Sequence, residues 1–373
     1  MNNQESSFVN PEQRSYEPRN INADPREQRQ RYAETYGDYA QQQMGGKIRP
    51  PRRRRRAPWL LLILLLVLVL AAGGVMSRVN TFTSNQKVIE THSFANISHP
   101  KLVIQGDSGT VHIHSGGSGN AVIVQVTKQE VGVGVANMND LQVNYTQNGS
   151  TINIETQSQN DFFFGSRQID LDITAPNASD LVVSTGSGDV QIDNINGPMT
   201  IKTGSGSIQS NSGNGQVTMI TGSGSVTASN INGQVTLKAG SGSINATNVS
   251  GQMSLSTGSG SINAGNINGQ VTLVAGSGRI QVSDAKLNGQ SILRTGSGSI
   301  VFAGSIDPNG NYTFDTGSGS IDATLPTSSA FALDVSSGSG TIHNDFGNPT
   351  VGNDPRAPLR LHTGSGSISL HKN

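Results

Sequence analysis

Apolar and polar residues alternate along most of the second half of the chain, and the alternation recurs with a fixed period. Apolar pairs with a spacing of two return once per repeat, as in Val235/Leu237 and Met253/Leu255. A spacing of two places side chains on one face of a β-strand, whereas a helix requires a spacing of three or four. The many β-branched residues also favour strands. The pattern therefore predicts a repetitive β-structure.

The triplet Gly-Ser-Gly marks each repeat. It begins at Gly186, Gly204, Gly222, Gly240, Gly258 and Gly276, with a constant 18-residue period, and then at Gly296, Gly317, Gly338 and Gly364. Each repeat predicts two short strands, one after Gly-Ser-Gly-Ser and one after Asn-Ile-Asn-Gly. A unit this thin cannot bury its apolar face alone, but stacked units cover one another. The sequence predicts an all-β fold, a β-solenoid of 18-residue repeats, with a sandwich or propeller of hairpins as the alternative.

The predicted corners and stacks have consequences for particular side chains. Leu237 and Ile244 are separated by an odd number of positions, yet both are expected to face inward, so the glycine-rich corner must absorb an odd residue. Equivalent residues of stacked coils lie about 4.8 Å apart. We therefore expect a partial hydrogen-bonded ladder of Asn194, Asn230, Asn248 and Asn266.

An apolar run of a different kind lies nearer the N-terminus. Trp59 to Met76 is an unbroken uncharged run with no polar residue at helical spacing. As a helix this run spans about 27 Å, close to the thickness of about 30 Å of a bilayer's hydrocarbon core. We expect a transmembrane helix over residues 57–76 and a short linker over 77–86. A cleaved signal peptide fits less well, because its apolar core is shorter and fewer residues precede it.

Basic residues cluster directly before this run, at Arg52 to Arg56. Residues 1–56 contain twelve Lys and Arg against seven Asp and Glu, whereas residues 77–373 contain thirteen against eighteen. The positive-inside rule then predicts a single-pass protein of the cell membrane, with a cytoplasmic N-terminus and an extracellular C-terminal domain. Because the arginine run adjoins the apolar segment, we expect it to contact anionic lipids and not nucleic acid. Residues 1–56 lack any strand or helix period and are expected to be a disordered cytoplasmic tail.

The extracellular part is expected to contain two regions. Residues 87–185 show strand-like alternation without the 18-residue period and predict irregular β-coils and a cap. Residues 186–373 predict the regular solenoid, with a loop over 349–358 before a last coil over 359–371. The chain contains no cysteine, so its stability must come from β-ladder hydrogen bonds and packing.

Two segments in a fixed order carry a resemblance to a known family. The segment from Asp170 to Pro176 reads Asp-Leu-Asp-Ile-Thr-Ala-Pro, and the segment from Thr185 to Val190 reads Thr-Gly-Ser-Gly-Asp-Val. This order resembles the bacterial putative-adhesin family, a domain of unknown function built from GSGS-type β-coils. The resemblance covers roughly residues 87–373 and implies a solenoid-like fold on a bacterial envelope. It transfers no catalytic residue.

Three patterns suggest chemistry, and each has a structural explanation. Asp315 to Ser318 matches the Asp-Thr-Gly-Ser of aspartic proteases, but that chemistry needs a second carboxylate. His112 and His114 share one strand face and could hold a metal ion with Asp107, although their spacing is not a strong ligand motif. Threonines precede the triplets at 185, 203, 221, 257, 295 and 316, as in ice-binding rows, but their parity places them near the corner and inward. The sequence therefore predicts no catalytic, cofactor-binding or metal-binding residue and no cofactor.

From these observations we expect a non-enzymatic, membrane-anchored, adhesin-like surface protein. Its solenoid would present a long polar face to an extracellular protein or a polysaccharide. One alternative is a carbohydrate-active solenoid enzyme, which would need charged residues clustered on one face. Another is a passive structural spacer that only sets a distance from the membrane. The sequence indicates no oligomeric state.

Overall fold

A computed structural model describes residues 83–116, 119–133, 140–158 and 164–373. The described residues belong to one compact unit, Gly73–Asn373, distinct from Met1–Ala72. The predicted tail (1–56), the predicted transmembrane helix (57–76) and most of the predicted linker (77–86) lie outside the described residues. Within the described part of the chain, no helix has the length and apolar character needed to cross a membrane.

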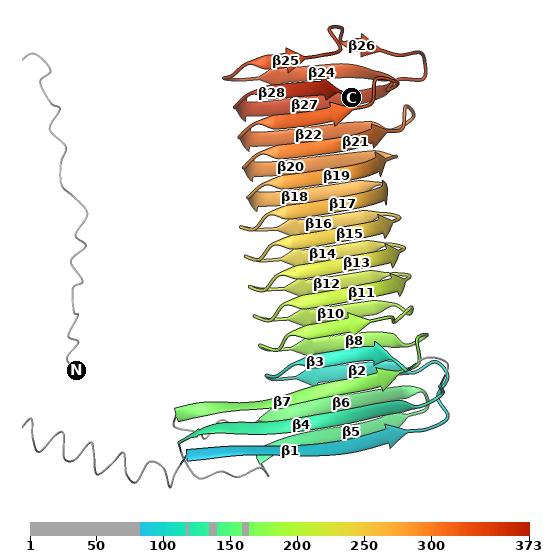
Figure 1. The fold of residues 1–373 in the computed structure, drawn as a ribbon, viewed down its shortest axis with the longest axis vertical. Coiled ribbons are helices and arrows are strands. Elements are labelled where there is room, and N and C mark those ends of the chain that lie inside the picture. Colours follow the sequence, from blue (N-terminus) through green and yellow to red (C-terminus); the bar gives the residue numbers. More distant parts are fainter. Residues whose placement is uncertain (1–82, 117–118, 134–139, 159–163) are drawn as a thin grey trace, which may run out of the picture. The chain divides into compact units, whose positions relative to one another are not determined.

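The described residues form two 14-stranded β-sheets that lie face to face (Figure 1). Sheet A contains, in spatial order, β1 (Thr83–Phe94), β4 (Val122–Val133), β7 (Phe164–Ala175), β3 (Val111–Ser115), β9 (Val190–Asp193), β11 (Ile208–Asn214), β13 (Val226–Asn232), β15 (Ile244–Ser250), β17 (Ile262–Gly269), β19 (Ile280–Leu287), β21 (Ile300–Ile306), β23 (Ile321–Leu325), β28 (Ile368–Lys372) and β25 (Ile342–Asn344). Sheet B contains β26 (Thr350–Val351), β24 (Phe331–Ser337), β27 (Ala357–Ser365), β22 (Asn311–Ser318), β20 (Gln290–Ser297), β18 (Val271–Ser277), β16 (Met253–Thr257), β14 (Val235–Ala239), β12 (Val217–Thr221), β10 (Met199–Thr203), β8 (Asp180–Thr185), β2 (Lys101–Gly106), β6 (Thr151–Ser158) and β5 (Leu141–Asn148). The predicted all-β, solenoid-like fold is confirmed for this part of the chain.

Each regular coil contributes one strand to each sheet. Strand β13 pairs in parallel with β15, Val226 opposite Ile244, and β14 pairs in parallel with β16, Val235 opposite Met253. Paired residues are therefore 18 positions apart in the sequence, and each residue stacks on its equivalent in the next coil. These are the two strands per repeat that the sequence predicts.

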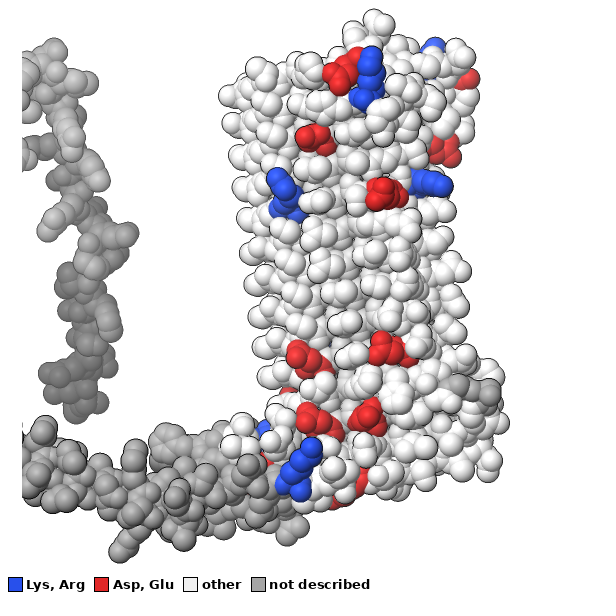
Figure 2. All heavy atoms as spheres, in the orientation of Figure 1, with Lys and Arg blue, Asp and Glu red and all other residues white. Residues whose placement is uncertain are grey.

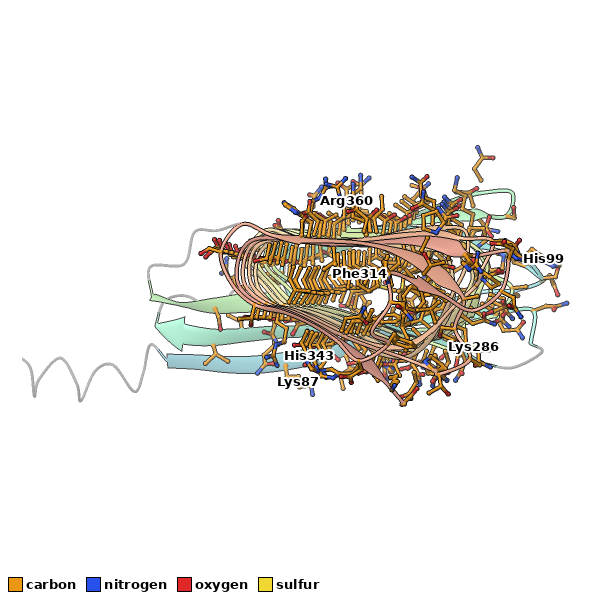
Figure 3. The ribbon with its side chains drawn as sticks, turned by 90° about the horizontal axis from the view of Figure 1, so that it is seen from above. Lys87, His99, Lys286, Phe314, His343 and Arg360 are labelled. Carbon is orange, nitrogen blue, oxygen red and sulfur yellow. The ribbon has the colours of Figure 1, made fainter. Side chains whose placement is uncertain are left out.

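The core is a continuous apolar stack between the two sheets. Its sheet A column contains Ile208, Val226, Ile244, Ile262, Ile280, Ile300, Ile321 and Ile368, all at most 1% exposed. Figure 3 shows Phe314 in the interior, with Arg360 and Lys286 projecting from opposite faces. Burying one Val, Leu or Ile contributes about 1.5–3 kcal/mol, so each added coil extends the core as well as the sheets.

A buried threonine closes the corner that follows several sheet B strands, whereas β14 and β18 carry Ala239 and Ala275 at this position. Thr221 Oγ1 donates to the carbonyl oxygen of Gly206 at 2.8 Å and accepts from the N–H of Gly224 at 3.1 Å. Thr203 and Thr257 make the equivalent pair of hydrogen bonds. These side chains are at most 6% exposed. The inward orientation expected from their parity is confirmed, and an exposed ice-binding row at these positions is excluded.

At the Gly-Ser-Gly corners, the backbones of successive coils stack too closely for a side chain at the glycine positions. Ser241 N–H donates to the carbonyl of Gly222 at 3.1 Å, so backbone lies directly on backbone. A Cβ added at Gly242 would overlap the carbonyl oxygen of Gly224, and one added at Gly260 would overlap that of Gly242. Close approach of two backbones thus explains why glycine recurs at this position.

The alternation of buried and exposed residues also shifts by one position inside the sheet A strands. In β15, Ile244 and Ala246 are buried, and the next buried residue, Val249, follows after three positions. Asn248 between them has a φ of 56°, a conformation that asparagine tolerates better than most residues. The bend therefore turns Val249 back toward the core.

Three of the four asparagines predicted to form a ladder, Asn230, Asn248 and Asn266, do so. Asn266 Nδ2 donates to Asn248 Oδ1 at 2.7 Å, and Asn248 Nδ2 donates to Asn230 Oδ1 at 2.9 Å. Asn230 Nδ2 in turn donates to Asn211 Oδ1 at 3.0 Å. The ladder begins at Asn211, because Ser212 has the positive φ in that coil; Asn194 lies one coil further down.

Both ends of the solenoid depart from sequential stacking. Strand β3 lies between β7 and β9, and β27 and β28 lie between the coil of β22 and β23 and that of β24 and β25. Residues 359–371 come last in the sequence and were expected to form the last coil. They are not the outermost coil in the structure. The outermost strands at this end are β25 and β26, and β26 lies within the expected loop over 349–358. At the other end, β4 pairs antiparallel with both β1 and β7.

Tyr312 closes one of the longer coils near the C-terminal end. Its side chain is fully buried. Its hydroxyl lies 3.0 Å from the carbonyl oxygens of Leu287 and Asp307 and accepts from the N–H of Asp307 at 2.9 Å. Burial raises the pKa of Tyr312 to about 12. The neutral phenol is therefore part of the folded structure.

Substituting Gly242→Ala is expected to destabilise the solenoid by about 1–3 kcal/mol, because the methyl group forces two stacked backbones apart. Gly265→Ala is the matched control. Its added Cβ would meet Ser283 Oγ at 3.5 Å, an ordinary contact, and alanine is the better strand residue. Thermal unfolding followed by circular dichroism measures both. Equal destabilisation by the two substitutions would contradict the stacking argument.

Tyr312→Phe is expected to cost about 1–3 kcal/mol below pH 10, because the buried partners of the hydroxyl lose their hydrogen bonds. The folded-state pKa of about 12 exceeds the ordinary value of about 10. The contribution of this phenol is therefore complete below pH 10 and is lost as the pH rises toward 12. Melting temperatures of both proteins across this range should converge; a constant difference would show that Tyr312 is not held neutral.

Candidate binding face

The outer face of sheet A carries two columns of side chains that alternate with the buried positions. Over β11, β13, β15 and β17 they consist of Gln209, Asn211, Thr227, Ser229, Asn245, Thr247 and Asn263, and Gly265 leaves a gap in one column. These four strands contain no Asp, Glu, Lys or Arg. Figure 2 shows an uncharged band in the middle of the column, with charged side chains nearer both ends. This face offers hydrogen bonds without net charge.

Amide side chains on this face bind to one another from coil to coil. Asn263 Nδ2 donates to Asn245 Oδ1 at 2.8 Å, parallel to the ladder through Asn248 and Asn266. Each amide has two N–H groups and two acceptor sites, so a ladder leaves donors and acceptors directed at solvent. Because the coils repeat at about 4.8 Å, these groups form a regular array.

The outer face of sheet B differs, because it carries cations at coil-equivalent positions. Lys202 and Lys238 lie on β10 and β14. On β20, Arg294 Nε lies 3.1 Å from Asp315 Oδ2, the aspartate of the protease-like Asp-Thr-Gly-Ser segment. Thr316 of that segment is buried and donates to the carbonyl of Gly298. Asp315 thus faces a guanidinium across the ladder, where aspartic-protease chemistry would require a second carboxylate.

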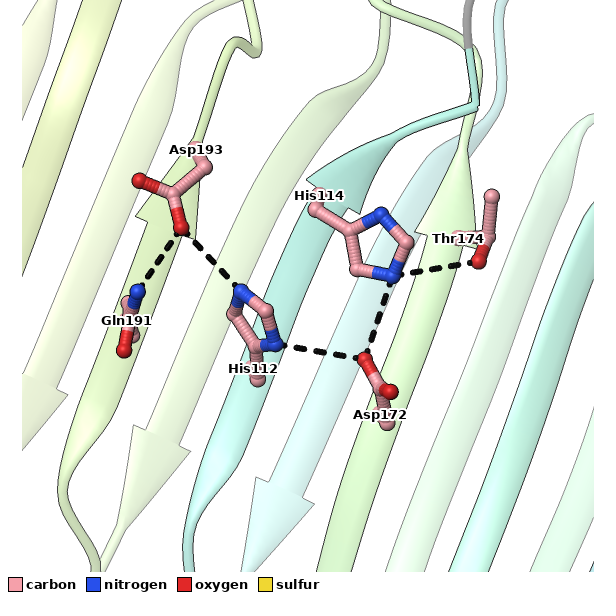
Figure 4. A network of polar contacts seen from close by, with 6 residues as sticks. All are labelled: His112, His114, Asp172, Thr174, Gln191 and Asp193. Atoms are coloured by element: carbon pink, nitrogen blue, oxygen red, sulfur yellow. Dashed lines mark hydrogen bonds and ion pairs between the residues drawn. The ribbon is translucent and has the colours of Figure 1, made fainter.

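Charged and titratable side chains gather beyond the N-terminal end of the uncharged band. His112 Nδ1 lies 3.3 Å from Asp172 Oδ1, and His114 Nε2 lies 3.2 Å from the same oxygen (Figure 4). We call His112, His114 and Asp172 the N-terminal histidine cluster. Parallel pairing places His112 of β3 directly opposite Asp172 of β7.

Two further side chains border this cluster. His112 Nε2 lies 3.1 Å from Asp193 Oδ2 on β9, and Gln191 Nε2 donates to the same Asp193 oxygen at 2.8 Å. The third ligand suggested by the sequence, Asp107, lies elsewhere and accepts a hydrogen bond from Ser158 Oγ at 3.2 Å. Asp107, which the sequence offered only as a possible third ligand, is not part of the cluster, because strand pairing brings a carboxylate from a distant part of the sequence closer to the histidines.

A second cluster lies near the C-terminal end of the same face. His343 Nε2 lies 2.6 Å from Asp345 Oδ1, and His371 Nδ1 lies 3.1 Å from Asp345 Oδ2. The hydrogen bond with His371, joined by the contact with His343, holds the pKa of Asp345 below its ordinary value, against an opposing effect of desolvation. We call His343, Asp345 and His371 the C-terminal histidine cluster. Sequence reasoning missed it, because its two histidines lie on strands that are far apart in the sequence.

The two clusters stand at opposite ends of one column. Successive pairings from β3 through β9 to β23, β28 and β25 place His112 and His343 in the same outward register. The uncharged band lies between them.

A buried ion pair fastens the cap strands. Glu130 on β4 is fully buried, and Arg167 Nη2 on β7 lies 3.3 Å from its Oε1 and 3.4 Å from Asp140 Oδ2. Breaking a buried pair by removing one partner typically costs about 3–5 kcal/mol. We therefore assign these residues to the cap structure.

The solved structures similar to this chain include three bacterial proteins of low sequence identity. A putative cell adhesion protein from Clostridium sporogenes is 10% identical, with 78% of this chain and 100% of that chain covered and a TM-score of 0.25. Putative adhesins from Parabacteroides distasonis and Bacteroides fragilis are 13% and 14% identical, cover 77% and 76% of this chain and 98% of their own, and both have a TM-score of 0.27. At these scores the likeness carries no argument about the site. No curated protein matches the chain.

A family model provides the firmer comparison. The model described as Toastrack DUF4097 matches residues 99–305, more than half of the 373 residues. The match covers the cap from β2 onward, the N-terminal histidine cluster and the coils as far as β21. It agrees with the resemblance found from the motifs at Asp170–Pro176 and Thr185–Val190. The protein belongs to the Toastrack DUF4097 family.

Proposed function

We propose that this protein is a membrane-anchored, non-enzymatic, adhesin-like surface protein whose sheet A face binds a polymer of the cell envelope. The observation that carries this proposal is the uncharged band over β11, β13, β15 and β17. It presents hydroxyl and amide groups at a constant spacing along a rigid column. A partner with its own repeated hydrogen-bonding groups can bind several coils at once, and the contributions of successive contacts then combine.

Anchoring is supported by the sequence. The apolar run from Trp59 to Met76 and the basic residues before it are typical of a single-pass segment with a cytoplasmic N-terminus. The solenoid would then project from the outer surface of the cell membrane. A basic segment next to the membrane would also contact anionic lipid headgroups.

A non-enzymatic role is supported by the surroundings of the catalytic candidates. Asp315 is paired with Arg294, and Thr316 closes a corner. A carbohydrate-active solenoid would require acidic and basic residues converging on a bound chain, whereas the middle of sheet A carries amides and hydroxyls. The passive-spacer alternative would leave this face without a partner.

Asn263→Lys is expected to weaken polymer binding about tenfold, which corresponds to about 1.4 kcal/mol, because it replaces a ladder amide with a charge in the uncharged band. Ser256→Lys is the matched control. It lies in the same coil on the opposite face, beside Lys238 of the preceding coil, where a lysine is already accommodated. Binding of the purified full-length chain to cell-wall fragments and polysaccharides measures the effect, with product analysis on the same samples.

The outcomes separate the alternatives. Saturable binding of an unchanged polymer that only Asn263→Lys weakens supports the proposal. Breakdown of the polymer would overturn the non-enzymatic role. Binding that neither substitution affects would exclude sheet A as the binding face. If nothing binds, and an unrelated rod replaces the solenoid without loss in cells, the protein is a spacer.

A further inference from the structure

We propose that the N-terminal histidine cluster binds a divalent transition-metal ion, with Zn²⁺ as the best match to its donors. His112, His114 and Asp172 are the ligands, and Asp193 is a positioning residue for His112. This inference goes beyond polymer binding and does not depend on it.

The first argument is convergence of the three donors. His112 Nδ1 and His114 Nε2 lie 3.3 and 3.2 Å from one oxygen, Asp172 Oδ1, and the ligand atoms of all three residues lie within 4.8 Å of one another. Ligands held about 2.0–2.1 Å from a tetrahedral zinc ion are about 3.3 Å apart. Two of the three separations between donor atoms therefore already match those around a tetrahedral ion.

The second argument concerns the proton on His112. Asp193 Oδ2 lies 3.1 Å from Nε2, and a carboxylate oxygen can only accept, so Nε2 carries the hydrogen. In the neutral imidazole the lone pair is then on Nδ1, and it faces Asp172 Oδ1, a second acceptor, at 3.3 Å. Two acceptors this close repel each other unless a second proton on the imidazole or a metal cation lies between them. A metal ion bound to both atoms removes this conflict.

The third argument is that the surroundings fix the orientation of the first ligand. Asp193 holds one nitrogen of His112, and Gln191 Nε2 holds Asp193 in turn. A carboxylate that accepts from the nitrogen opposite the metal is the usual partner of a metal-binding histidine. Figure 4 shows His112 between the two carboxylates, each from a neighbouring strand. Since these strands belong to one sheet, the donors are placed before any ion binds.

The C-terminal histidine cluster has the same residue types but a different geometry. Its ligand atoms also lie within 4.8 Å of one another, but its two imidazoles contact opposite oxygens of Asp345, so the donors do not share one oxygen. His343 also lies on a three-residue edge strand and is 66% exposed. A substitution in the C-terminal histidine cluster can therefore serve as the control for substitutions in the N-terminal histidine cluster.

The donor set specifies the class of ion. Two imidazoles and one carboxylate suit Zn²⁺ and neighbouring divalent transition metals, whereas Ca²⁺ and Mg²⁺ prefer oxygen ligands alone. Asp172 is 49% exposed, and the two histidines are about a third exposed. The ion would therefore keep at least one position open to solvent, where water or a carboxylate of a partner can bind.

The test is a titration of the purified full-length chain, made without a polyhistidine tag, with Zn²⁺ by calorimetry. Co²⁺ serves as the spectroscopic probe, because its visible absorption reports coordination geometry. The wild type is expected to bind, and His112→Gln and His114→Gln each to weaken Zn²⁺ binding about 100-fold or more. Asp193→Asn keeps every ligand but accepts poorly from Nε2, and should weaken binding about 10–100-fold.

His371→Gln is the matched control, and it should leave both the Zn²⁺ affinity and the Co²⁺ spectrum unchanged. The unfolding temperature of each metal-free variant shows whether the solenoid is intact, which separates ligand loss from misfolding. Absence of Zn²⁺ binding by the wild type would overturn the proposal. So would a loss of binding in His371→Gln with none in His112→Gln. An Asp193→Asn protein with full affinity would overturn the positioning role alone.

Discussion

Backbone contact between successive Gly-Ser-Gly corners is the constraint on which the rest of this structure depends. The corner of each coil rests on the carbonyl groups of the corner below, as Ser241 does on Gly222. This contact leaves no space for a side chain and fixes the register at one repeat. Once the register is fixed, isoleucine lies on isoleucine inside the column and asparagine on asparagine outside it. The core and the polar face are therefore two results of the same stacking.

Most of the column could be predicted because it follows from one repeated unit. The two strands, the inward threonines and the asparagine ladder each depend on residues within one coil and its neighbour. The ends could not be predicted in this way. The insertion of β27 and β28 beneath β24 and β25 depends on which sheet edges are still open when the chain returns, and no periodicity in the sequence records this order.

The N-terminal histidine cluster shows the same limit at the scale of side chains. The alternation of His112 and His114 was visible in the sequence, but their carboxylate neighbours were not. Because β3 lies between β7 and β9, Asp172 approaches His112 from one side and Asp193 from the other. Sequential stacking would have given β3 a different pair of neighbours. The out-of-order strand thus creates the cluster.

The irregular ends and the interchangeable middle give the molecule a modular length. A duplication or deletion of one 18-residue unit between β11 and β17 would leave both ends, and both histidine clusters, as they are. It would change the separation of the clusters by one rung of the sheet, about 4.8 Å. Unequal recombination between the repeats can therefore change the length of the solenoid one coil at a time, while both ends stay the same.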